Sequence, residues 1–493
     1  SLCGEHGDGR LRGEMIPFMF GEEIYEYFKQ IKQIFDPNGI FNPGKIVDAP
    51  RMNTFLRIDH TKPKREFQTY FNFDNDGGFS NSIEKCNGSG DCRKPQILGG
   101  TMCPSYKATL DEKHTTRARA NALREIISKS NKGNPFVDED LMEVFSLCLS
   151  CKACKSECPS NVDVTKLKAE FLQHYYDDAG VPFNVWMIGN LNIFNRIGSF
   201  APKFYNFIVK NKVTSSVLKY LLKFEQKRQL PELKEISLKK WDRKHQAART
   251  NRQIYLFADE FTNYFDSDIG VKAILLLEKL GYGVKIAPVG ESGRTFFSKG
   301  LLKRAKKIAE MNVRNLADLI NENTPLLGLE PSAILTFRDE YKEIVSGDLH
   351  DSAKNIARHT FLLDEFLANE FEKGQINSNS FTEQSLNIML HTHCHQKALA
   401  GSDALMKVLS IPENYQVEEI KSGCCGMAGS FGFEKDKYDV SMKIGELALF
   451  PAVRNAPEDT IIVANGTSCR HQIAEGTSRK ALHFVEVLYD AMK

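Results

Sequence analysis

Hydrophobic and polar positions along the chain predict helices in its first part and a mixed fold further on. Residues 21–36 (GEEIYEYFKQIKQIFD) and 164–176 (VTKLKAEFLQHYY) show the three-to-four-residue apolar spacing of amphipathic helices, and residues 111–127 add a capped helix. From residue 251 to 493, short apolar runs alternate with helical patterns, which is typical of α/β architecture. The sequence therefore predicts an α+β protein of several domains.

The α/β part contains an internal repeat. Three pairs of segments match in order: 254–261 (IYLFADEF) with 388–395 (IMLHTHCH), 289–300 (VGESGRTFFSKG) with 422–433 (SGCCGMAGSFGF), and 327–333 (LGLEPSA) with 463–469 (VANGTSC). Each segment closes a strand-like run, so the side chains of each half should meet at strand ends. In the second half the matched positions hold Cys394, Cys424, Cys425 and Cys469, whereas in the first they hold Glu260, Glu291, Ser292 and Ala333. We expect one half to bind a metal and the other to be scaffold.

Composition and charge narrow the function classes. The chain has 493 residues, 42% of them hydrophobic, which is ample for several buried cores. Its 65 Lys and Arg nearly balance 63 Asp and Glu, so a nucleic-acid partner is not expected. The chain starts without Met, as a piece of a longer protein would, and no leader is recognisable. The apolar stretch 181–200 is broken by polar residues, so we expect a soluble, cytoplasmic protein. In a reducing cytosol the 12 cysteines suit metal binding better than disulfides.

The strongest motif is the cysteine run at residues 148–158. Its spacing, C-x2-C-x2-C-x3-C-P, is that of bacterial two-cluster ferredoxins, in which the fourth cysteine ligates the other cluster. An earlier run has the same order with a longer gap, but serine replaces its second cysteine: Cys86, Ser89, Cys92 and Cys103. Crossing the fourth ligands assigns Cys103, Cys148, Cys151 and Cys154 to one 4Fe-4S cluster. The other cluster receives Cys86, Cys92 and Cys158, with Ser89 at its fourth corner.

Three alternatives remain for the Ser89 corner. The cluster is 3Fe-4S with a vacant corner, it is 4Fe-4S with a serine or water ligand, or only one of the two clusters forms. Next to the runs, Arg117, Arg119 and Arg124 are spaced along the helix at 111–127, where we expect a solvated basic face rather than a role in offsetting cluster charge.

The adjacent Cys424 and Cys425, within "GCCGMAG", resemble the cysteine-rich CCG domains of heterodisulfide reductases and of the iron–sulfur subunits of glycolate oxidase. The resemblance covers residues 251–493 and implies an iron–sulfur cluster or zinc on Cys394, Cys424, Cys425 and Cys469. His391, His393 and His395 are further candidates, for which hydrogen bonding to the site is expected more often than direct ligation. Buried free cysteines are the remaining alternative.

The N-terminal segments "GEHGDGR" (4–10) and "FDPNGIFNPGKI" (35–46) resemble the C-terminal end of FAD-linked oxidases of the vanillyl-alcohol-oxidase type, the D-lactate and D-2-hydroxyglutarate dehydrogenases. The resemblance implies that His6 is a base for the hydroxy-acid proton and that Glu5 joins a divalent metal site beside the flavin. Because the FAD-binding domain is absent from these residues, the chain alone is not expected to hold FAD or to turn over substrate.

Together these features predict six regions: residues 1–50, the end of an FAD-linked oxidase domain; 51–82, a linker; 83–180, a two-cluster ferredoxin-like domain; 181–250, a helical connector; 251–376, a CCG-like repeat without cysteines; and 377–493, the CCG repeat with cysteines. The connector's aromatic and basic helices are expected to pack onto the protein, with peripheral membrane contact at the inner face as the alternative.

The predicted function is the iron–sulfur portion of an FAD-dependent D-2-hydroxy-acid dehydrogenase, which passes electrons to a quinone or a redox protein. The alternative is a stand-alone electron-transfer subunit or a heterodisulfide-reductase-like protein.

Overall fold

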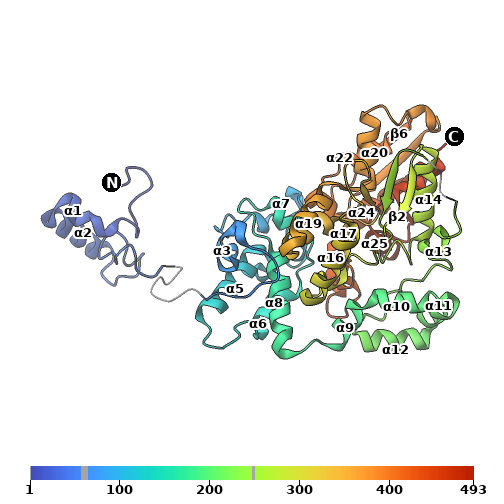
Figure 1. Ribbon diagram of the computed structural model, residues 1–493. Helices are drawn as coiled ribbons and strands as arrows, with labels where there is room; N and C mark the ends of the chain where they lie inside the picture. The colour runs from blue at the N-terminus through green and yellow to red at the C-terminus, as the bar shows by residue number, and fades with distance from the viewer. Residues whose placement is uncertain (1, 57–64, 247–249) are drawn as a thin grey trace. The chain divides into compact units, whose positions relative to one another are not determined.

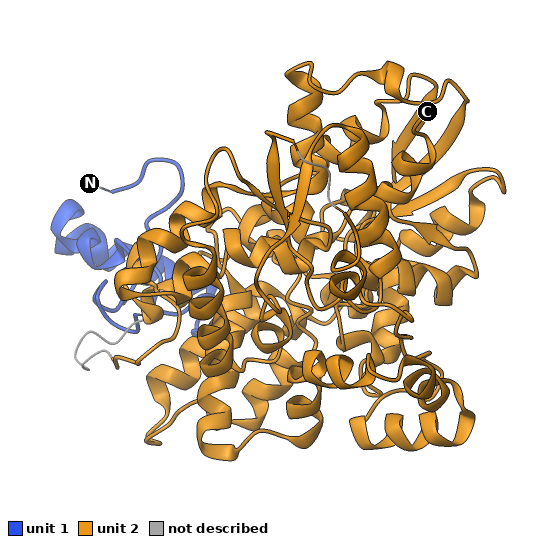
Figure 2. Cartoon of the chain, turned by 45° about the vertical axis from the view of Figure 1, so that its right-hand side comes forward, with its two compact units in different colours: residues 1–64 blue, residues 65–493 orange. Residues whose placement is uncertain are grey.

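The computed structural model describes residues 2–56, 65–246 and 250–493, and it divides into two compact units. Figure 2 shows unit 1, residues 1–64, in blue and unit 2, residues 65–493, in orange. Parts of the predicted linker and connector, residues 57–64 and 247–249, lie outside the described residues. All the cysteines of the two runs and of the repeat therefore belong to unit 2.

Unit 1 centres on helix α2 (Glu22–Phe35), the helix predicted at residues 21–36, which follows the short helix α1 (Ile16–Phe20). The helix ends at Asp36, whose buried carboxylate pairs with Lys32 at 2.5 Å. Several apolar side chains of α2 are exposed: Ile24, Tyr27, Ile31, Ile34 and Phe35. Unit 1 by itself therefore leaves much of its apolar surface uncovered.

Short helices surround the two cysteine runs in unit 2 (Figure 1). They are α3 (Phe79–Glu84), α4 (Pro104–Thr109), α5 (Thr116–Lys129), α6 (Glu139–Ser146), α7 (Ala153–Glu157) and α8 (Val164–Ala179). The helix predicted from residue 111 begins later, because Asp111 caps a short 3-10 turn and Thr115 caps α5 by accepting from the N–H of Ala118. The helix predicted at 164–176 is α8, whose N–H groups at Thr165 and Lys166 are capped by Asp163.

Five helices connect this region to the sheets: α9 (Phe183–Gly189), α10 (Leu191–Gly198), α11 (Pro202–Lys210), α12 (Lys212–Leu222) and α13 (Leu238–Asp242). The sequence predicted that these helices pack onto the protein. In the structure only part of their apolar surface does so. Val185, Ile188 and Val209 are buried, but many large apolar side chains of α9–α12 are exposed. The sequence pattern missed this because these helices carry apolar residues on two faces.

Residues 253–482 contain two parallel four-stranded sheets. The first has β1 (Gln253–Leu256), β2 (Gly283–Ile286), β3 (Leu326–Gly328) and β4 (Thr360–Leu362), in the order β2-β1-β3-β4. The second has β5 (Leu386–His391), β6 (Tyr415–Glu419), β7 (Ile461–Ala464) and β8 (Ala481–Leu482), in the order β6-β5-β7-β8. Ile254 pairs with Val284 in the first sheet, and Ile388 pairs with Val417 in the second. The strand order is thus the same in both halves of the predicted repeat.

Helices cover both sheets. Those of the first half are α14 (Ser267–Lys279), α15 (Arg294–Ser298), α16 (Leu302–Leu316), α17 (Pro331–Arg338), α18 (Tyr341–Ile344), α19 (His350–Arg358) and α20 (Leu363–Glu372). Those of the second half are α21 (Cys394–Leu399), α22 (Asp403–Leu409), α23 (Tyr438–Glu446), α24 (Leu449–Asn455), α25 (Thr467–Thr477) and α26 (Phe484–Asp490). The halves join where α14 packs on α26 and α20 packs on α22.

One hydrophobic core runs from the cysteine runs into the first half of the repeat, and it also includes Cys394 and Cys424 of the second half. The two cysteine-rich parts of unit 2 therefore share a core.

Candidate metal centres

Every cysteine of the two runs and of the repeat is buried. Of the 12 cysteines, only Cys3 is half-exposed, and no disulfide joins any of them in the described chain. Buried thiols without disulfides fit a site that binds iron–sulfur clusters or zinc, since thiolate is the ligand that both prefer.

The second run winds around its own cysteines. Ser150 (φ 53°) and Lys152 (φ 64°) adopt the left-handed backbone conformation on either side of Cys151. Burial raises the pKa of Cys154, and the nearby charges of Asp163 and Cys148 raise it further. Burial also raises the pKa of Cys151, with the charges of Cys394, Cys154 and Cys148 adding to it. The three cysteines assigned to one cluster are therefore close enough to interact.

Two positive charges lie beside this run. Burial acts to raise the pKa of Cys148, but Arg119 and Lys168 outweigh it and lower that pKa. Lys168 Nζ donates to the carbonyl oxygen of Cys148 at 2.5 Å, and burial lowers the pKa of Lys168 to about 8. The prediction of a solvated basic face is wrong for Arg119, which is buried and donates to Ser105 Oγ at 3.1 Å.

The first run brings Cys92 and Cys103 together. Their thiols hydrogen-bond to one another, which lowers the pKa of Cys92 to about 6 and raises that of Cys103. Cys103 Sγ also accepts from the N–H of Thr116 at 3.1 Å. The charge of Arg119 reaches Cys103 as it does Cys148. Cys103 thus lies between its own run and the second run, and the crossed assignment stays a prediction.

Ser89 differs in burial from the cysteines of its run. It is exposed, its N–H donates to Asn87 Oδ1 at 3.0 Å, and its hydroxyl bonds to Asp91. Cys86 and Cys92 are both buried. The group at the fourth corner of this cluster stays a prediction.

The four cysteines of the second half of the repeat meet at the carboxyl ends of strands β5, β6 and β7. Hydrogen bonds link Cys394 to Cys424, Cys424 to Cys425 and Cys425 to Cys469. The bond from Cys424 lowers the pKa of Cys394 to about 7, and the bonds from Cys424 and Cys469 hold that of Cys425 well below its ordinary value. Parallel strands present their carboxyl ends at one edge, which explains why residues far apart in sequence converge here.

His391 belongs to the same site. One of its ring nitrogens, Cys425 Sγ and Cys469 Sγ lie within 4.8 Å of one another. His391 Nδ1 bonds to Ser422 Oγ at 2.8 Å, and the His391 ring is close enough to Cys425 to help lower the pKa of that thiol. A buried imidazole nitrogen beside two thiols fits a metal ligand, so the geometry groups His391 with Cys425 and Cys469, a group that does not include Cys394 or Cys424.

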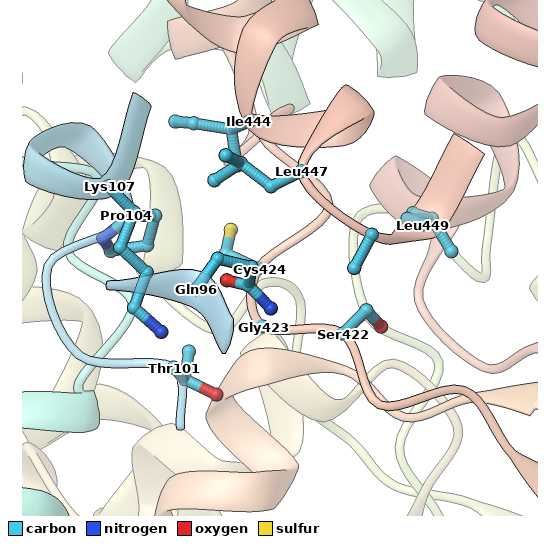
Figure 3. Close-up of a pocket in the computed structure, with 11 residues that line it drawn as sticks. Gln96, Thr101, Pro104, Lys107, Ser422, Gly423, Cys424, Ile444, Leu447 and Leu449 are labelled. Carbon is cyan, nitrogen blue, oxygen red and sulfur yellow. The ribbon is translucent and has the colours of Figure 1, made fainter. Parts of the chain in front are cut away.

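Glycines make room for this loop. Gly426 has φ +94°, and a Cβ there would lie 2.3 Å from the carbonyl oxygen of Ser441. Figure 3 shows the loop facing the end of the first run: Ser422, Gly423 and Cys424 line a small pocket together with Thr101, Pro104 and Lys107. The repeat's cysteine loop therefore packs closely against the segment around Cys103.

The second run also contacts the repeat. His395 Nε2 donates to the carbonyl oxygen of Ser150 at 2.9 Å, and α21 packs on α7. The charge of Cys394 raises the pKa of Cys151. One hydrogen bond therefore joins the residue before Cys151 to the residue after Cys394.

Buried ion pairs hold the second run in place. Lys152 Nζ lies 2.6 Å from an Asp339 oxygen and 2.5 Å from a Glu340 oxygen. Lys155 also pairs with Asp339, and Arg294 pairs with Glu340 at 2.5 Å. Sequence reasoning missed Lys152, for which the only signal was a lysine placed between two ligand cysteines, whereas it had named His395 as a candidate for hydrogen bonding at the repeat site.

The sulfur-free half fills the matched positions with hydrogen-bonded polar groups. Glu260 accepts from the N–H of Ser292 at 2.8 Å and from its hydroxyl at 2.7 Å. Burial raises the pKa of Glu291 to about 7, and Ala333 is buried within α17. Glu330 crosses to the other half, where it accepts from the N–H of Thr467 at 2.8 Å. The first half thus supports the second.

In unit 1, Glu5 and His6 are neighbours on an exposed loop. His6 Nε2 lies 3.8 Å from a Glu5 oxygen, and the N–H of His6 donates to Cys3 Sγ at 3.1 Å. Both side chains are exposed, so they are free to face a group that unit 1 does not itself contain.

Two family models match the chain. Residues 1–46 match the C-terminal domain of FAD linked oxidases, and residues 85–163 match a 4Fe-4S dicluster domain. No solved structure matches.

Curated relatives extend the similarity. The D-2-hydroxyglutarate dehydrogenase of Escherichia coli K12 is 28% identical over 100% of this chain and 51% of that protein. A subunit of the anaerobic glycerol-3-phosphate dehydrogenase of the same organism is 24% identical over 64% of this chain and 79% of its own length. Lactate utilization protein A of Bacillus subtilis 168 is 27% identical over 36% of this chain and 74% of that protein.

The chain spans about half the length of the D-2-hydroxyglutarate dehydrogenases that it matches. Its own residues nevertheless match both kinds of domain, so the chain is similar to fusions of an FAD-linked oxidase with an iron–sulfur protein.

Proposed function

We propose that the chain is the electron-transfer portion of an FAD-dependent D-2-hydroxy-acid dehydrogenase, acting on D-2-hydroxyglutarate or D-lactate. The observation that carries the proposal is the contact between the two cysteine-rich sites, made by the hydrogen bond from His395 to Ser150. Because of this contact, an electron carrier bound by the second cysteine run would lie beside one bound by the cysteines of the repeat.

The ligand sets follow from the buried thiols. Cys148, Cys151 and Cys154, with Cys103, are proposed to hold a 4Fe-4S cluster. Cys86, Cys92 and Cys158 hold the second cluster, with 3Fe-4S favoured because Ser89 is exposed. Bound clusters supply one-electron carriers between a two-electron donor and the acceptor.

The chain's own residues tune these sites. Arg119 places a positive charge near Cys103 and Cys148, and Lys168 adds another near Cys148. Such charges offset those of the thiolates and favour a cluster that has gained an electron.

At the repeat, Cys394, Cys424, Cys425 and Cys469 are proposed as ligands of an iron–sulfur cluster or zinc, with His391 as a fifth candidate. His393 and His395 have other partners: His393 Nδ1 accepts from the N–H of His395 at 3.1 Å, and His395 donates to Ser150. Their proposed role is to hold the loop.

At the flavin end, the proposal gives His6 the role of the base that takes the hydroxyl proton of the substrate. Glu5, 3.8 Å away, orients it or binds a divalent metal. Imidazole suits the first role because it titrates near neutrality. The acceptor is proposed to be a quinone or a redox protein, reached at the inner face of the membrane.

The full-length gene product tests the proposal. D-2-hydroxyglutarate or D-lactate should reduce a dye through it, and low-temperature EPR of the same sample should show two cluster signals, one of them of the oxidised 3Fe-4S type. Cys424→Ala should remove any signal of the repeat site and leave the other two, whereas Cys3→Ser, the control, should leave all signals unchanged. Failure of both hydroxy acids with intact cluster signals would refute the substrate class.

A second candidate is a heterodisulfide-reductase-like activity or a stand-alone electron-transfer subunit. The adjacent, hydrogen-bonded thiols of Cys424 and Cys425 favour it. Disulfide reduction with reduced dye, in the absence of any hydroxy acid, distinguishes it from the first.

A further inference from the structure

Helices α9–α12 carry an uncovered apolar surface. On α10 and α11, the exposed side chains Ile193, Ile197, Phe204 and Phe207 lie three or four residues apart within each helix, and Phe200 between the helices is 84% exposed. This spacing places them on one side of each helix. The apolar sides of α10 and α11 therefore face the solvent.

Helix α12 continues the pattern. Val213, Val217, Tyr220 and Leu221 follow helical spacing, and Val213 and Tyr220 are 71% and 79% exposed. Figure 1 shows α10, α11 and α12 side by side, and α11 packs on α12. Large aromatic and aliphatic groups rarely gather on a surface that faces only water.

Basic residues outnumber acidic ones on this surface, where Glu235 and Glu232 pair with Lys203 and Lys210 only. Residues 181–224 contain no Asp or Glu, but they contain six basic residues: Arg196, Lys203, Lys210, Lys212, Lys219 and Lys223. Arg196, Lys212 and Lys223 are exposed and form no salt bridge to any residue that the structure describes. The whole chain carries only +2, so the positive charge is local.

Exposed apolar stripes beside unpaired basic groups match the chemistry of an anionic lipid surface, where aromatic groups enter the headgroup boundary and lysines meet phosphates. None of the described helices combines the length and the apolar character needed to cross a bilayer. We propose that α9–α12 dock the protein on the face of an anionic bilayer, with the apolar side chains inserted and the basic ones at the phosphates. This inference rests on the proposed acceptor at the membrane, and it adds the docking surface, α9–α12, and the lipid class, anionic phospholipid.

Vesicle co-sedimentation tests this surface. The chain and its full-length gene product should bind vesicles of phosphatidylcholine and phosphatidylglycerol in equal parts, and should bind phosphatidylcholine alone far less. Lys212→Gln and Lys223→Gln should each weaken binding about fivefold. The double variant Phe204→Ser/Val217→Ser should weaken it about tenfold or more.

Matched controls lie on exposed positions elsewhere. Lys354→Gln and Met311→Ser change the same residue types on α19 and α16 and should leave vesicle binding unchanged. Equal binding to both vesicle types, no binding by the full-length protein, or α9–α12 variants that bind normally would overturn the proposal. The first result indicates neutral lipid, and the second indicates a surface covered by another protein segment.

Cluster signals and dye reduction in the same samples separate this inference from the proposed function. The α9–α12 variants should retain both while losing vesicle binding. If vesicle binding behaves as expected but hydroxy acids reduce no dye, the proposed function fails and the lipid surface stands.

Discussion

At the residue scale, a single buried arginine lies near thiols of both cysteine runs. Arg119 is 2% exposed and its charge acts on Cys103 and Cys148. A positive charge held in a place of low dielectric stabilises negative groups more than the same charge in water.

We expect Arg119→Leu to lower the midpoint potential of the cluster held by Cys103 and the second run, since adding an electron then lacks a nearby positive charge. Redox titration followed by EPR measures the shift. Arg117→Leu on the same helix is the control, because Arg117 pairs with Glu112 at the surface. Equal potentials in wild type and Arg119→Leu would exclude a tuning role.

His395 is the second residue with a predicted effect. His395→Ala should leave the buried carbonyl of Ser150 without its donor, which costs about 1–3 kcal/mol. It should also slow electron arrival at the repeat site, as stopped-flow spectroscopy of the loaded protein would show. His350→Ala removes a bond to the carbonyl of Val345, which belongs to neither cysteine-bearing loop, and it should affect neither the signals nor the rate.

At the element scale, helix α8 holds an extended segment through one carboxyl group. Glu170, fully buried, accepts from the N–H groups of Tyr70 and Phe71, both at 2.7 Å. Burial raises the pKa of Glu170 to about 8, and His174 Nε2 lies 3.9 Å from it with its own pKa lowered by burial.

The raised pKa of Glu170 predicts a pH dependence. A carboxyl whose folded pKa exceeds its unfolded value of about 4.3 contributes full stability below that value and loses it as pH rises through about 8. We expect the thermal midpoint to fall between about pH 4.3 and 8, and Glu170→Gln to flatten this fall while keeping the acceptor oxygen. Exposed Asp140→Asn should not change the profile; an equally steep profile in Glu170→Gln would contradict the assignment.

The sequence predicted α2 and α8 well, because amphipathic spacing and capping residues act locally. The repeat's matching strand orders agree with the predicted duplication, since parallel strands align their carboxyl ends, while the ligand set at that edge stays a prediction. It could not find the partners of Arg119 and His395, because those contacts depend on how separate elements pack. The exposure of apolar side chains on α9–α12 could not be predicted for the same reason.

At the scale of the whole molecule, the second cysteine run is fastened to the sulfur-free half of the repeat. Asp339 pairs with both Lys152 and Lys155, and these charges hold its pKa well below the ordinary range despite its burial.

Asp339→Asn should therefore destabilise unit 2 strongly, by about 3–5 kcal/mol, because it leaves buried lysines with less compensation. Urea unfolding followed by circular dichroism measures the loss. Asp348→Asn, on an exposed turn nearby, should change the midpoint little. A small effect of Asp339→Asn would mean that Glu340 alone satisfies Lys152.

These ion pairs indicate a structural role for the half of the repeat that has no cysteines. A duplicated domain normally offers two equivalent binding edges, and electrons could then divide between them. Here the first half holds Glu260, Glu291 and Ser292 at the matched positions, and its Asp339 and Glu340 pair with Lys152 of the second cysteine run. If the cysteine-bearing half binds a cluster as proposed, only that half of the repeat can carry electrons, and the other half holds the second cysteine run beside it.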